Sequence, residues 1–539
     1  IRDNLVDYGL SATEERRMIA QLVDEEHCDF IMEQIESHRP QGKLKALAFC
    51  RNITHARMMC EAMGEHFHTA YLTGRNDIGE RIRAYNDLQS DSADLEILFT
   101  VDILNEGVDI PGVNMVLFLR PTESSTIFIQ QLGRGLRKYE NKSYVTVLDF
   151  IGNSYKRSVQ IAFALSSLAQ NFVLEKRLMQ SLVKDNFSAI GLSQYGVEIN
   201  IDDLSKEEIL EYIDKENFNS IKYLKQDYFN FKKYINSEFY PKHMDYINND
   251  CAPDIIRFMS VKTKGTKGKK NRSYYNFLRG IGEENLPDFT DEQVAFANYL
   301  SGFLPLVRLH EFEIVRSLLN GISNIEEINA ILEDKIVGYH KTELAHALTY
   351  LQFVTNQNGL LKLNVKIDDQ FREYIIDLID YGTTRYIIDN GEEPGFKLWQ
   401  NYRIDQVQLK LLKNPLHNQV GTYYYDDTVV IFASLKKDAS VEERLNYKDK
   451  FLQPNLFQWE SMRNLPSNDL DNLKSSKYAY LFIRKVAKEN GIVLPFTYVG
   501  TGKLTNPRKV EGDNGTYLFD IIMQEDLPDY LQYDFGLTK

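Results

Sequence analysis

The stretch of sequence that decides the fold runs from residue 95 to residue 111 and reads LEILFTVDILNEGVDIP. Its first part, up to Thr100, is a short apolar run, which is typical of a strand buried on both faces of a sheet. The second part contains Gly107 and ends at Pro111, which predicts a loop. Open parallel sheets bind ligands at the carboxyl ends of their strands, where such loops begin. We therefore expect binding residues here, although an ordinary connection between two strands is the alternative interpretation.

Similar apolar runs lie on both sides of this stretch, and segments with helical spacing separate them. We predict further strands at 44–50, 69–72, 113–119 and 144–150, and helices at 53–67, 77–89 and 125–136. Apolar strands that alternate with helices indicate a parallel sheet covered by helices on both faces. The expected fold class is therefore α/β for this part of the chain.

Outside this sheet the pattern changes. Residues 1–40 have the spacing of a helix, and residues 160–390 are mostly helical. From about residue 396 onward, runs rich in Val, Ile, Tyr and Phe predict strands at 428–435, 478–486, 496–500 and 516–523. We expect four parts: a helical linker at 1–40, the α/β lobe at 41–165, a mainly helical middle region at 166–390, and a β-rich C-terminal domain at 391–539.

Composition excludes several classes of protein. The chain has 539 residues, of which 43% are hydrophobic and 26% charged, as in ordinary globular proteins. It has neither an apolar run of ~18 residues nor a visible secretory signal, so we expect no membrane partner. A net charge of −14 argues against non-specific coating of nucleic acid but permits a local basic groove. The four cysteines lack the spacing of a zinc site or disulfide framework, so we expect no metal ligands and a cytoplasmic location.

The segment 130–137, QQLGRGLR, carries the strongest chemical signal. On a helix, Gln130, Arg134 and Arg137 project along one stripe. Two guanidiniums three residues apart can grip a polyphosphate. Gly133 and Gly135 each cost about 1 kcal/mol in a helix, which indicates close approach by a ligand or another domain. A solvated face with surface ion pairs is the alternative.

Together these segments resemble the successive C-terminal motifs of superfamily 2 helicases. The resemblance covers roughly residues 43–155 and rests on 47–50 with 54–56, 71–74 with Arg81, 100–111, and 130–137. Residues 120–124 and 147–152 resemble the bacterial branch related to type III restriction helicase subunits. We expect a RecA-like lobe that clamps ATP together with a first lobe of the same kind.

The resemblance also implies roles for individual residues and for ligands. Arg134 and Arg137 match the arginine fingers of the family, and Gln130 supports them. Gly107, Asp109 and Gly133 match positions beside the nucleotide, whereas Thr100 and Thr73 match positions that contact nucleic acid. The implied cofactors are ATP and Mg²⁺, and the implied partner is nucleic acid, with DNA favoured over RNA.

The chain departs from the family in one respect, because it contains no G-x-x-x-x-G-K-[ST] segment. We expect this segment in a missing N-terminal lobe that holds the phosphates and most of the Mg²⁺ coordination, and we expect no ATP hydrolysis by this chain alone. Residues 23–27, VDEEH, superficially resemble the magnesium motif D-E-x-H. They fall in a predicted amphipathic helix rather than after a buried strand, so we interpret them as a solvated helix face.

Three further features fit nucleic acid or have simpler explanations. Lysines and aromatic residues alternate over 221–243, which suits single-stranded nucleic acid, but the aromatic residues also recur at the spacing of a helix core. The basic loop 262–272 includes Lys269 and Lys270, which either contact phosphates or are only solvated. Trp459 and Tyr498 either form a pocket for a flipped or modified base or lie in the core of a small β-barrel.

The C-terminal region, back to about Phe396, resembles a domain of unknown function that ends some bacterial superfamily 2 helicases. Two functions therefore remain. The first is the C-terminal portion of an ATP-dependent DNA helicase or translocase, acting in defence, restriction or repair. The second is a binding module for nucleic acid or a modified base, in which the motor lobe is a scaffold.

Overall fold

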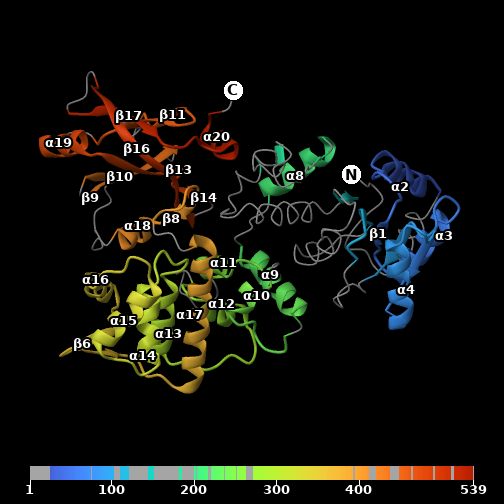
Figure 1. Cartoon of the computed structure of the whole chain (residues 1–539), viewed down its shortest axis with the longest axis horizontal. Coiled ribbons are helices and arrows are strands. Elements are labelled where there is room, and N and C mark those ends of the chain that lie inside the picture. Colours follow the sequence, from blue (N-terminus) through green and yellow to red (C-terminus); the bar gives the residue numbers. More distant parts are fainter. Residues whose placement is uncertain are drawn as a thin grey trace. The chain divides into compact units, whose positions relative to one another are not determined.

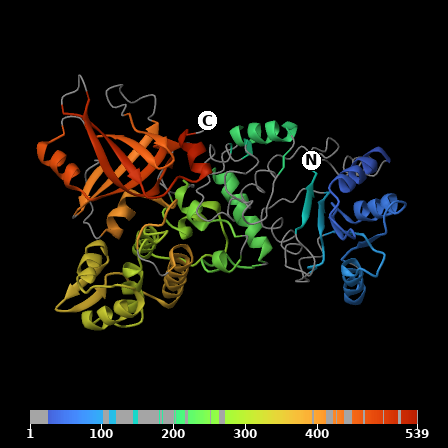
Figure 2. The same cartoon turned by 45° about the horizontal axis from the view of Figure 1, so that its top comes forward.

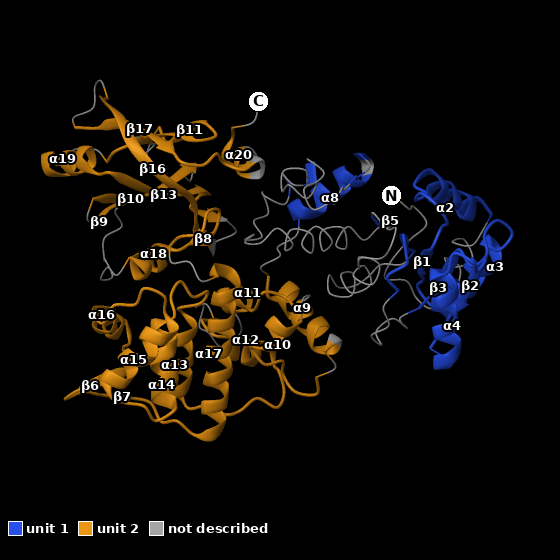
Figure 3. Cartoon of the chain, viewed as in Figure 1, with its two compact units in different colours: residues 1–168, 179–216 blue, residues 169–178, 217–539 orange. Residues whose placement is uncertain are grey.

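The computed structural model forms two compact units, residues 1–168 with 179–216 and residues 169–178 with 217–539 (Figures 1 and 3). We describe each unit by itself. The structure describes residues 25–74, 76–101, 110–119, 144–150, 180, 183–184, 200–201, 203–215, 220–235, 237–249, 252–262, 271–391, 395–411, 421–425, 427–436, 448–462, 465–489, 492–510 and 515–537.

The first unit is built on a parallel sheet with the strand order β2-β3-β1-β4-β5, and every pairing in it is parallel. Its strands are β1 (Ala46–Phe49), β2 (Thr69–Leu72), β3 (Ile97–Thr100), β4 (Met115–Phe118) and β5 (Thr146–Asp149). Alternate residues of the central strands enter two separate apolar cores, one on each face. The predicted α/β class is therefore confirmed, and β1, β3 and β4 carry apolar residues at consecutive positions because both of their faces are buried.

Helices cover both faces of this sheet. The described helices of the unit are α2 (Glu25–Ser37), α3 (Ile53–Met63), α4 (Ile78–Gln89) and α8 (Asp203–Lys215). Apolar residues of α2 and α3 join one core, and Tyr85 and Leu88 of α4 join the other. The sequence sets where α4 begins, because Asp77 and Glu80 form a capping box. The helix predicted at 125–136 lies outside the described residues.

The second unit begins with a helical region, as predicted. Its helices are α9 (Ile221–Tyr234), α10 (Asp245–Asn248), α11 (Ile255–Ser260), α12 (Tyr274–Ile281), α13 (Asp291–Ser301), α14 (His310–Leu319), α15 (Ile325–Lys335), α16 (Thr342–Tyr350) and α17 (Asp369–Asn390). The structure adds an unpredicted hairpin of β6 (Val354–Gln357) and β7 (Leu360–Leu363). Asn358 and Gly359 form its turn, with φ angles of 53° and 86°.

A mixed sheet follows and confirms the predicted β-rich end (Figure 2). Its strands run in the order β11-β12-β17-β16-β13-β10-β9, and β8 pairs with β16. They are β8 (Asn401–Tyr402), β9 (Thr422–Tyr425), β10 (Thr428–Lys436), β11 (Lys450–Gln453), β12 (Leu456–Glu460), β13 (Tyr478–Val486), β16 (Phe496–Lys509) and β17 (Tyr517–Met523). The pair β10 and β13 is parallel, whereas the other pairs are antiparallel. Apolar cores lie on both faces of this sheet.

Shorter elements complete the β-rich part: α18 (Ile404–Lys410), α19 (Ser467–Ser475), α20 (Asp529–Phe535), β14 (Lys488–Glu489) and β15 (Ile492–Val493). Hydrogen bonds connect α18 and the residue before it to the helical region. Arg403 Nη1 donates to the carbonyl of Leu304 at 3.0 Å, and Gln406 Nε2 donates to that of Pro305 at 2.7 Å. The second unit thus contains both the helical region and the sheet, and the domain boundaries expected at 40, 165 and 390 stay predictions. Within the described part of the chain, no helix has the length and apolarity that a membrane crossing requires.

Close packing of α17 against α14 generates a first prediction. A Cβ atom on Gly382 would lie 2.5 Å from Cε2 of Phe312 and 3.1 Å from Cδ2 of Leu304. We expect Gly382→Ala to lower the free energy of unfolding by about 1–3 kcal/mol in urea titrations, although alanine is the better helix former.

A double-mutant cycle controls this prediction. Phe312→Leu removes the ring atoms that a new Cβ would meet, so the two substitutions together should destabilise by less than the sum of their separate effects. Additive effects, or a Gly382→Ala protein as stable as wild type, would show that the contact does not limit packing here.

Candidate functional site

The carboxyl ends of the parallel strands in the first unit lie level with one another at one edge of the sheet. Thr100 ends β3 and is in register with Leu72 of β2 on one side and Phe49 of β1 on the other. Phe118 of β4 is level with Phe49, and Asp149 of β5 is level with Phe118. Residues at and just beyond these ends are the candidates for ligand contact in such a sheet.

Thr100 lies at this edge, at the end of the strand between β2 and β1. Its side chain is fully buried, and its hydroxyl Oγ1 has no hydrogen-bond partner within the described ranges. Leaving a buried hydroxyl unpaired costs about 1–3 kcal/mol. The hydroxyl can therefore donate and accept a hydrogen bond that no described residue provides. Thr100 is also the position that, by the family resemblance, we expect to contact nucleic acid.

Thr73 begins the turn that follows β2 and is also buried. Its backbone N–H and its hydroxyl both donate to Oδ1 of Asn76, at 2.8 and 3.2 Å. The guanidinium of Arg81 donates to the carbonyls of Asn76 and Gly74, each at 3.1 Å. Arg81, which lies in the first turn of α4, therefore stabilises the turn that begins within residues 71–74. The sequence analysis had not singled out Asn76, since no motif marks it.

His55 lies beside the end of β1, in the first turn of α3. Asn52 caps this helix by accepting a hydrogen bond from the backbone N–H of His55 at 2.9 Å. The backbone N–H of Arg51 donates to Nδ1 of His55 at 3.3 Å, so the ring proton is on Nε2. Burial, with the nearby His27 and Arg51, lowers the pKa of His55 to about 4. The imidazole is therefore neutral at pH 7.

The segment that resembles a magnesium motif lies in part on α2. Glu25 and Glu26 are exposed, which confirms a solvated helix face for them, but His27 is buried, so that interpretation was wrong for the histidine. Its ring lies 6.2 Å from that of Phe30. Over the described ranges, His, Cys, Asp and Glu side chains form no group that could hold a metal ion.

The predicted nucleotide residues and two lysines of the basic loop lie outside the described part of the chain. Residues 102–109, 120–143 and 263–270 lie outside the described part of the chain. The affected residues are Gly107, Asp109, Gln130, Gly133, Arg134, Arg137, Lys269 and Lys270. Their roles stay predictions.

The structure does not bring Trp459 and Tyr498 together, which corrects the expectation of one aromatic pocket. Trp459 is 5% exposed and belongs to the core on one face of the C-terminal sheet, where its ring lies 5.9 Å from that of Phe519. Tyr498 is equally buried but belongs to the core on the other face, 5.0 Å from the ring of Phe482. The cause is strand alternation, because β12 and β16, which lie on either side of β17, present these two residues to opposite faces of the sheet. Both residues lie in apolar cores, as the alternative interpretation held.

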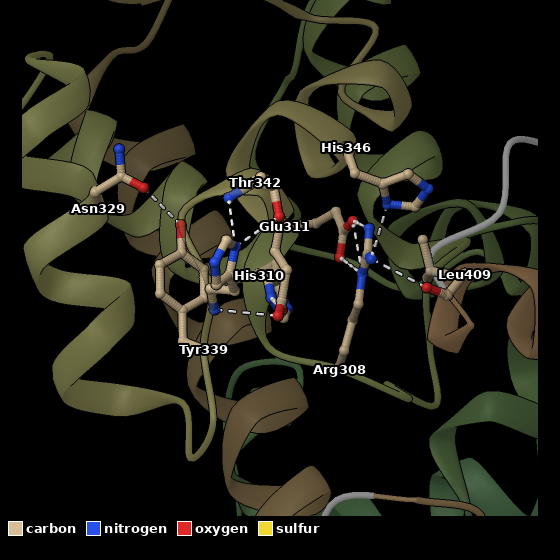
Figure 4. Close-up of polar contacts among 10 residues, drawn as sticks. Arg308, His310, Glu311, Asn329, Tyr339, Thr342, His346 and Leu409 are labelled. Carbon is tan, nitrogen blue, oxygen red and sulfur yellow. Dashed lines mark hydrogen bonds and ion pairs between the residues drawn. The ribbon is translucent and has the colours of Figure 1, made fainter.

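A buried polar cluster in the second unit was not found by sequence reasoning (Figure 4). Arg308 is 6% exposed, and its Nε donates to both carboxylate oxygens of Glu311 at 3.1 Å. Its Nη1 donates to the carbonyl of Leu409 at 3.0 Å and contacts Nδ1 of His346 at 3.1 Å. The guanidinium therefore joins α14, α16 and α18.

Neighbouring side chains of the same cluster are paired as well. Nε2 of His310 lies 2.7 Å from Oε2 of Glu343, and the hydroxyl of Tyr339 donates to Oδ1 of Asn329 at 2.7 Å. Since each carboxylate here has a basic partner, we interpret the cluster as a structural junction.

Comparison with known families adds three matches. The helicase conserved C-terminal domain matches residues 26–139, which contain all the described sheet strands of the first unit except β5. A domain of unknown function (DUF8090) matches residues 224–360, and another (DUF3427) matches residues 396–533. The last match confirms the resemblance that the sequence indicated back to Phe396.

Individual relatives agree with the first match. The putative ATP-dependent helicase IRC3 of Saccharomyces cerevisiae is 34% identical over 87 residues, 16% of this chain and 12% of that protein. The type I restriction enzyme EcoKI endonuclease subunit of Escherichia coli is 31% identical over 111 residues, 18% and 9% of the two chains. The putative ATP-dependent RNA helicase MJ1505 of Methanocaldococcus jannaschii is 31% identical over 86 residues, 15% and 11%. Each match covers only about a tenth of the relative's length.

The parallel sheet and the helicase family match define a RecA-like lobe of the helicase C-terminal type. Residues 26–139 of the chain are therefore similar to the C-terminal domain that helicases share.

The buried hydroxyl of Thr100 generates a second prediction. We expect Thr100→Val to leave the free energy of unfolding unchanged or to raise it by up to about 3 kcal/mol, because valine replaces a buried hydroxyl that has no partner among the described residues. Thr69→Val is the matched control in β2. The Thr69 hydroxyl donates to the carbonyl of Cys60 at 2.8 Å, so its loss should destabilise by about 1 kcal/mol. Equal destabilisation in urea by both variants would contradict the prediction.

The neutral His55 generates a third prediction. Its pKa in the folded lobe is about 4, below the ordinary value of 6.5. Between these values the unfolded chain binds a proton that the folded lobe does not, so stability is full above pH 6.5 and falls as the pH drops toward 4. By pH 5 the loss due to this one group should reach about 2 kcal/mol.

Urea titrations at pH 7 and pH 5 measure this difference. In His55→Asn the stability of the first unit should depend on pH less steeply by that amount. His66→Asn, which removes an exposed histidine, should keep the wild-type dependence. A His55→Asn protein with an unchanged dependence would show that His55 does not stay neutral.

Proposed function

We propose that this chain supplies the second motor lobe of an ATP-dependent superfamily 2 helicase or translocase that acts on DNA. The observation that carries the proposal is the buried hydroxyl of Thr100, which has no hydrogen-bond partner among the described residues. It lies at the edge where the parallel strands end, in a chain that matches the helicase C-terminal domain. In this proposal Thr100 and Thr73 contact the backbone of the nucleic acid. The braced turn at Asn76 and Arg81 holds Thr73 in position.

The nucleotide side of the lobe follows from the resemblance. Arg134 and Arg137 act as arginine fingers, and Gln130 supports them. Phosphoryl transfer spreads negative charge over the γ-phosphoryl oxygens, and a positioned arginine accelerates it by about 10³–10⁵. Gly107, Asp109 and Gly133 adjoin the nucleotide.

ATP and Mg²⁺ are the cofactors of this proposal, and the first lobe holds them through its G-x-x-x-x-G-K-[ST] segment. When bound, ATP supplies the free energy of movement. In this chain the residues from Thr100 to Asp109 form one continuous stretch. This stretch joins the proposed nucleic-acid contact to the proposed nucleotide contact, so a short length of backbone connects the two proposed sites.

DNA is favoured because one relative is a subunit of a restriction enzyme, which also fits a role in defence or restriction. Another relative carries the name of an RNA helicase, so the test must include both nucleic acids. Repair is the other pathway that suits a DNA translocase.

The fourth prediction tests the proposed motor. In a protein that carries this chain together with the first lobe, Arg137→Ala should lower kcat for nucleic-acid-stimulated ATP hydrolysis by about 10³ or more. Arg83→Ala is the control, since Arg83 is exposed on α4 and has no ion pair within the described residues. A wild-type rate in Arg137→Ala would exclude the arginine-finger role.

The same assay tests the nucleic-acid contact and the choice of substrate. Thr100→Val should weaken binding of a single-stranded oligonucleotide, because valine cannot bond to a phosphate oxygen. DNA and RNA oligonucleotides of the same sequence should be compared as activators. Stimulation by RNA alone would show that DNA is the wrong substrate.

A further inference from the structure

Helix α9 presents an exposed stripe of three lysines and one aromatic residue. Lys222, Lys225, Phe229 and Lys233 stand at positions i, i+3, i+7 and i+11, which share one face of a helix. All four are exposed, and Phe229 is 38% exposed. At a rise of 1.5 Å per residue this lysine–phenylalanine stripe is about 16 Å long.

The opposite face of α9 is core. Tyr223, Leu224, Tyr228 and Phe231 are buried, and the ring of Tyr228 lies 6.0 Å from that of Phe277 on α12. For these aromatic residues the core interpretation of the segment 221–243 is confirmed. Phe229 is different, because it lies on the solvent side between lysines.

Among the described residues, no carboxylate forms an ion pair with a lysine of the stripe. Lys222 and Lys233 form no ion pair with any residue in the described ranges. Nζ of Lys225 donates to the carbonyl of Ile281 at 2.9 Å and lies 5.6 Å from the centre of the Phe229 ring. By contrast, Lys232 lies off the stripe and is paired with the buried carboxylate of Glu283.

A hollow of about 290 Å³ lies at the C-terminal end of the stripe. It is lined by Phe229, Lys232, Lys233, Ser237 and Glu238. Nearby in the chain, Phe239 is 62% exposed. The hollow therefore offers the ring of Phe229, the ammonium group of Lys233 and the exposed carboxylate of Glu238 to a small planar group, whereas Lys232 is paired with Glu283.

We propose that this stripe binds single-stranded nucleic acid. Phe229 stacks against an unpaired base, and Lys222, Lys225 and Lys233 neutralise phosphates on either side of it. The proposal rests on the proposed function, since it adds a second contact to the strand that the motor lobe engages. A single strand fits better than a duplex because only an unpaired base offers its face to an exposed ring. An acidic peptide would use the lysines but not the ring.

Fluorescence anisotropy of the full chain with a labelled dT20 oligonucleotide, over a series of KCl concentrations, tests the proposal. Phe229→Ala should weaken binding about 5- to 150-fold, as for other stacked bases, and Phe229→Trp should bind like wild type. Lys222→Gln with Lys233→Gln should reduce the slope of log K against log salt by about 1.4, because each phosphate contact contributes about 0.7 on single strands.

Matched controls come from the same unit. Lys362→Gln removes an exposed lysine on β7, and Ile388→Ala removes an exposed apolar side chain on α17. Both should keep the wild-type affinity and salt slope. Far-ultraviolet circular dichroism of each variant checks that the helices are intact.

The outcomes separate this inference from the proposed function. If the stripe variants bind dT20 like the controls while Thr100→Val binds more weakly, the stripe is not a nucleic-acid site and the motor proposal stands. If the stripe variants weaken binding while Thr100→Val does not, the stripe proposal stands and the contact at Thr100 is wrong. Tighter binding of a poly-glutamate peptide than of dT20, unchanged by Phe229→Ala, would overturn the stripe proposal in favour of a protein partner.

Discussion

Parallel strands cannot be joined by a tight turn, and this constraint shapes both units of the protein. In the first unit each strand must return through a crossover, so the carboxyl ends of β1 to β5 lie level at one edge. The chain resumes from that edge in turns and loops, where polar residues such as Thr73 and Thr100 can lie against a buried sheet. In the second unit β10 and β13 are the parallel pair, and β11, β12 and α19 lie between them in the chain. The candidate site thus follows from strand direction as much as from residue type.

Strand positions were predictable because burial on both faces leaves a simple trace in the sequence. The fully buried strands β1, β3 and β4 fall within the predicted runs 44–50, 95–100 and 113–119. The family resemblance also marked Thr100 as a contact. That its hydroxyl lacks a partner in the described residues could not be predicted, since it depends on how β1 and β2 pack on either side. The arrangement of the nucleotide residues at 107–109 and 130–137 stays untested, because they lie outside the described ranges.

Two differences from expectation have physical causes. The hairpin β6–β7 was missed because its strands are short and mostly exposed, so they carry no apolar pattern, although Asn358-Gly359 is a strong turn signal. The sequence allowed a shared pocket for Trp459 and Tyr498. Alternation within one strand does not show which face of the sheet a residue of another strand occupies. Register between strands decides that, and it is set by pairing across the sheet.

The bond from Arg308 to the carbonyl of Leu409 bears on how such proteins can evolve. The arginine belongs to the segment 224–360 matched by one family model, and its acceptor belongs to the segment 396–533 matched by another. Exchange of either segment by recombination would leave a buried guanidinium facing a foreign backbone. The two segments are therefore expected to be inherited as a pair, with substitutions around Arg308 and Leu409 changing in concert across lineages.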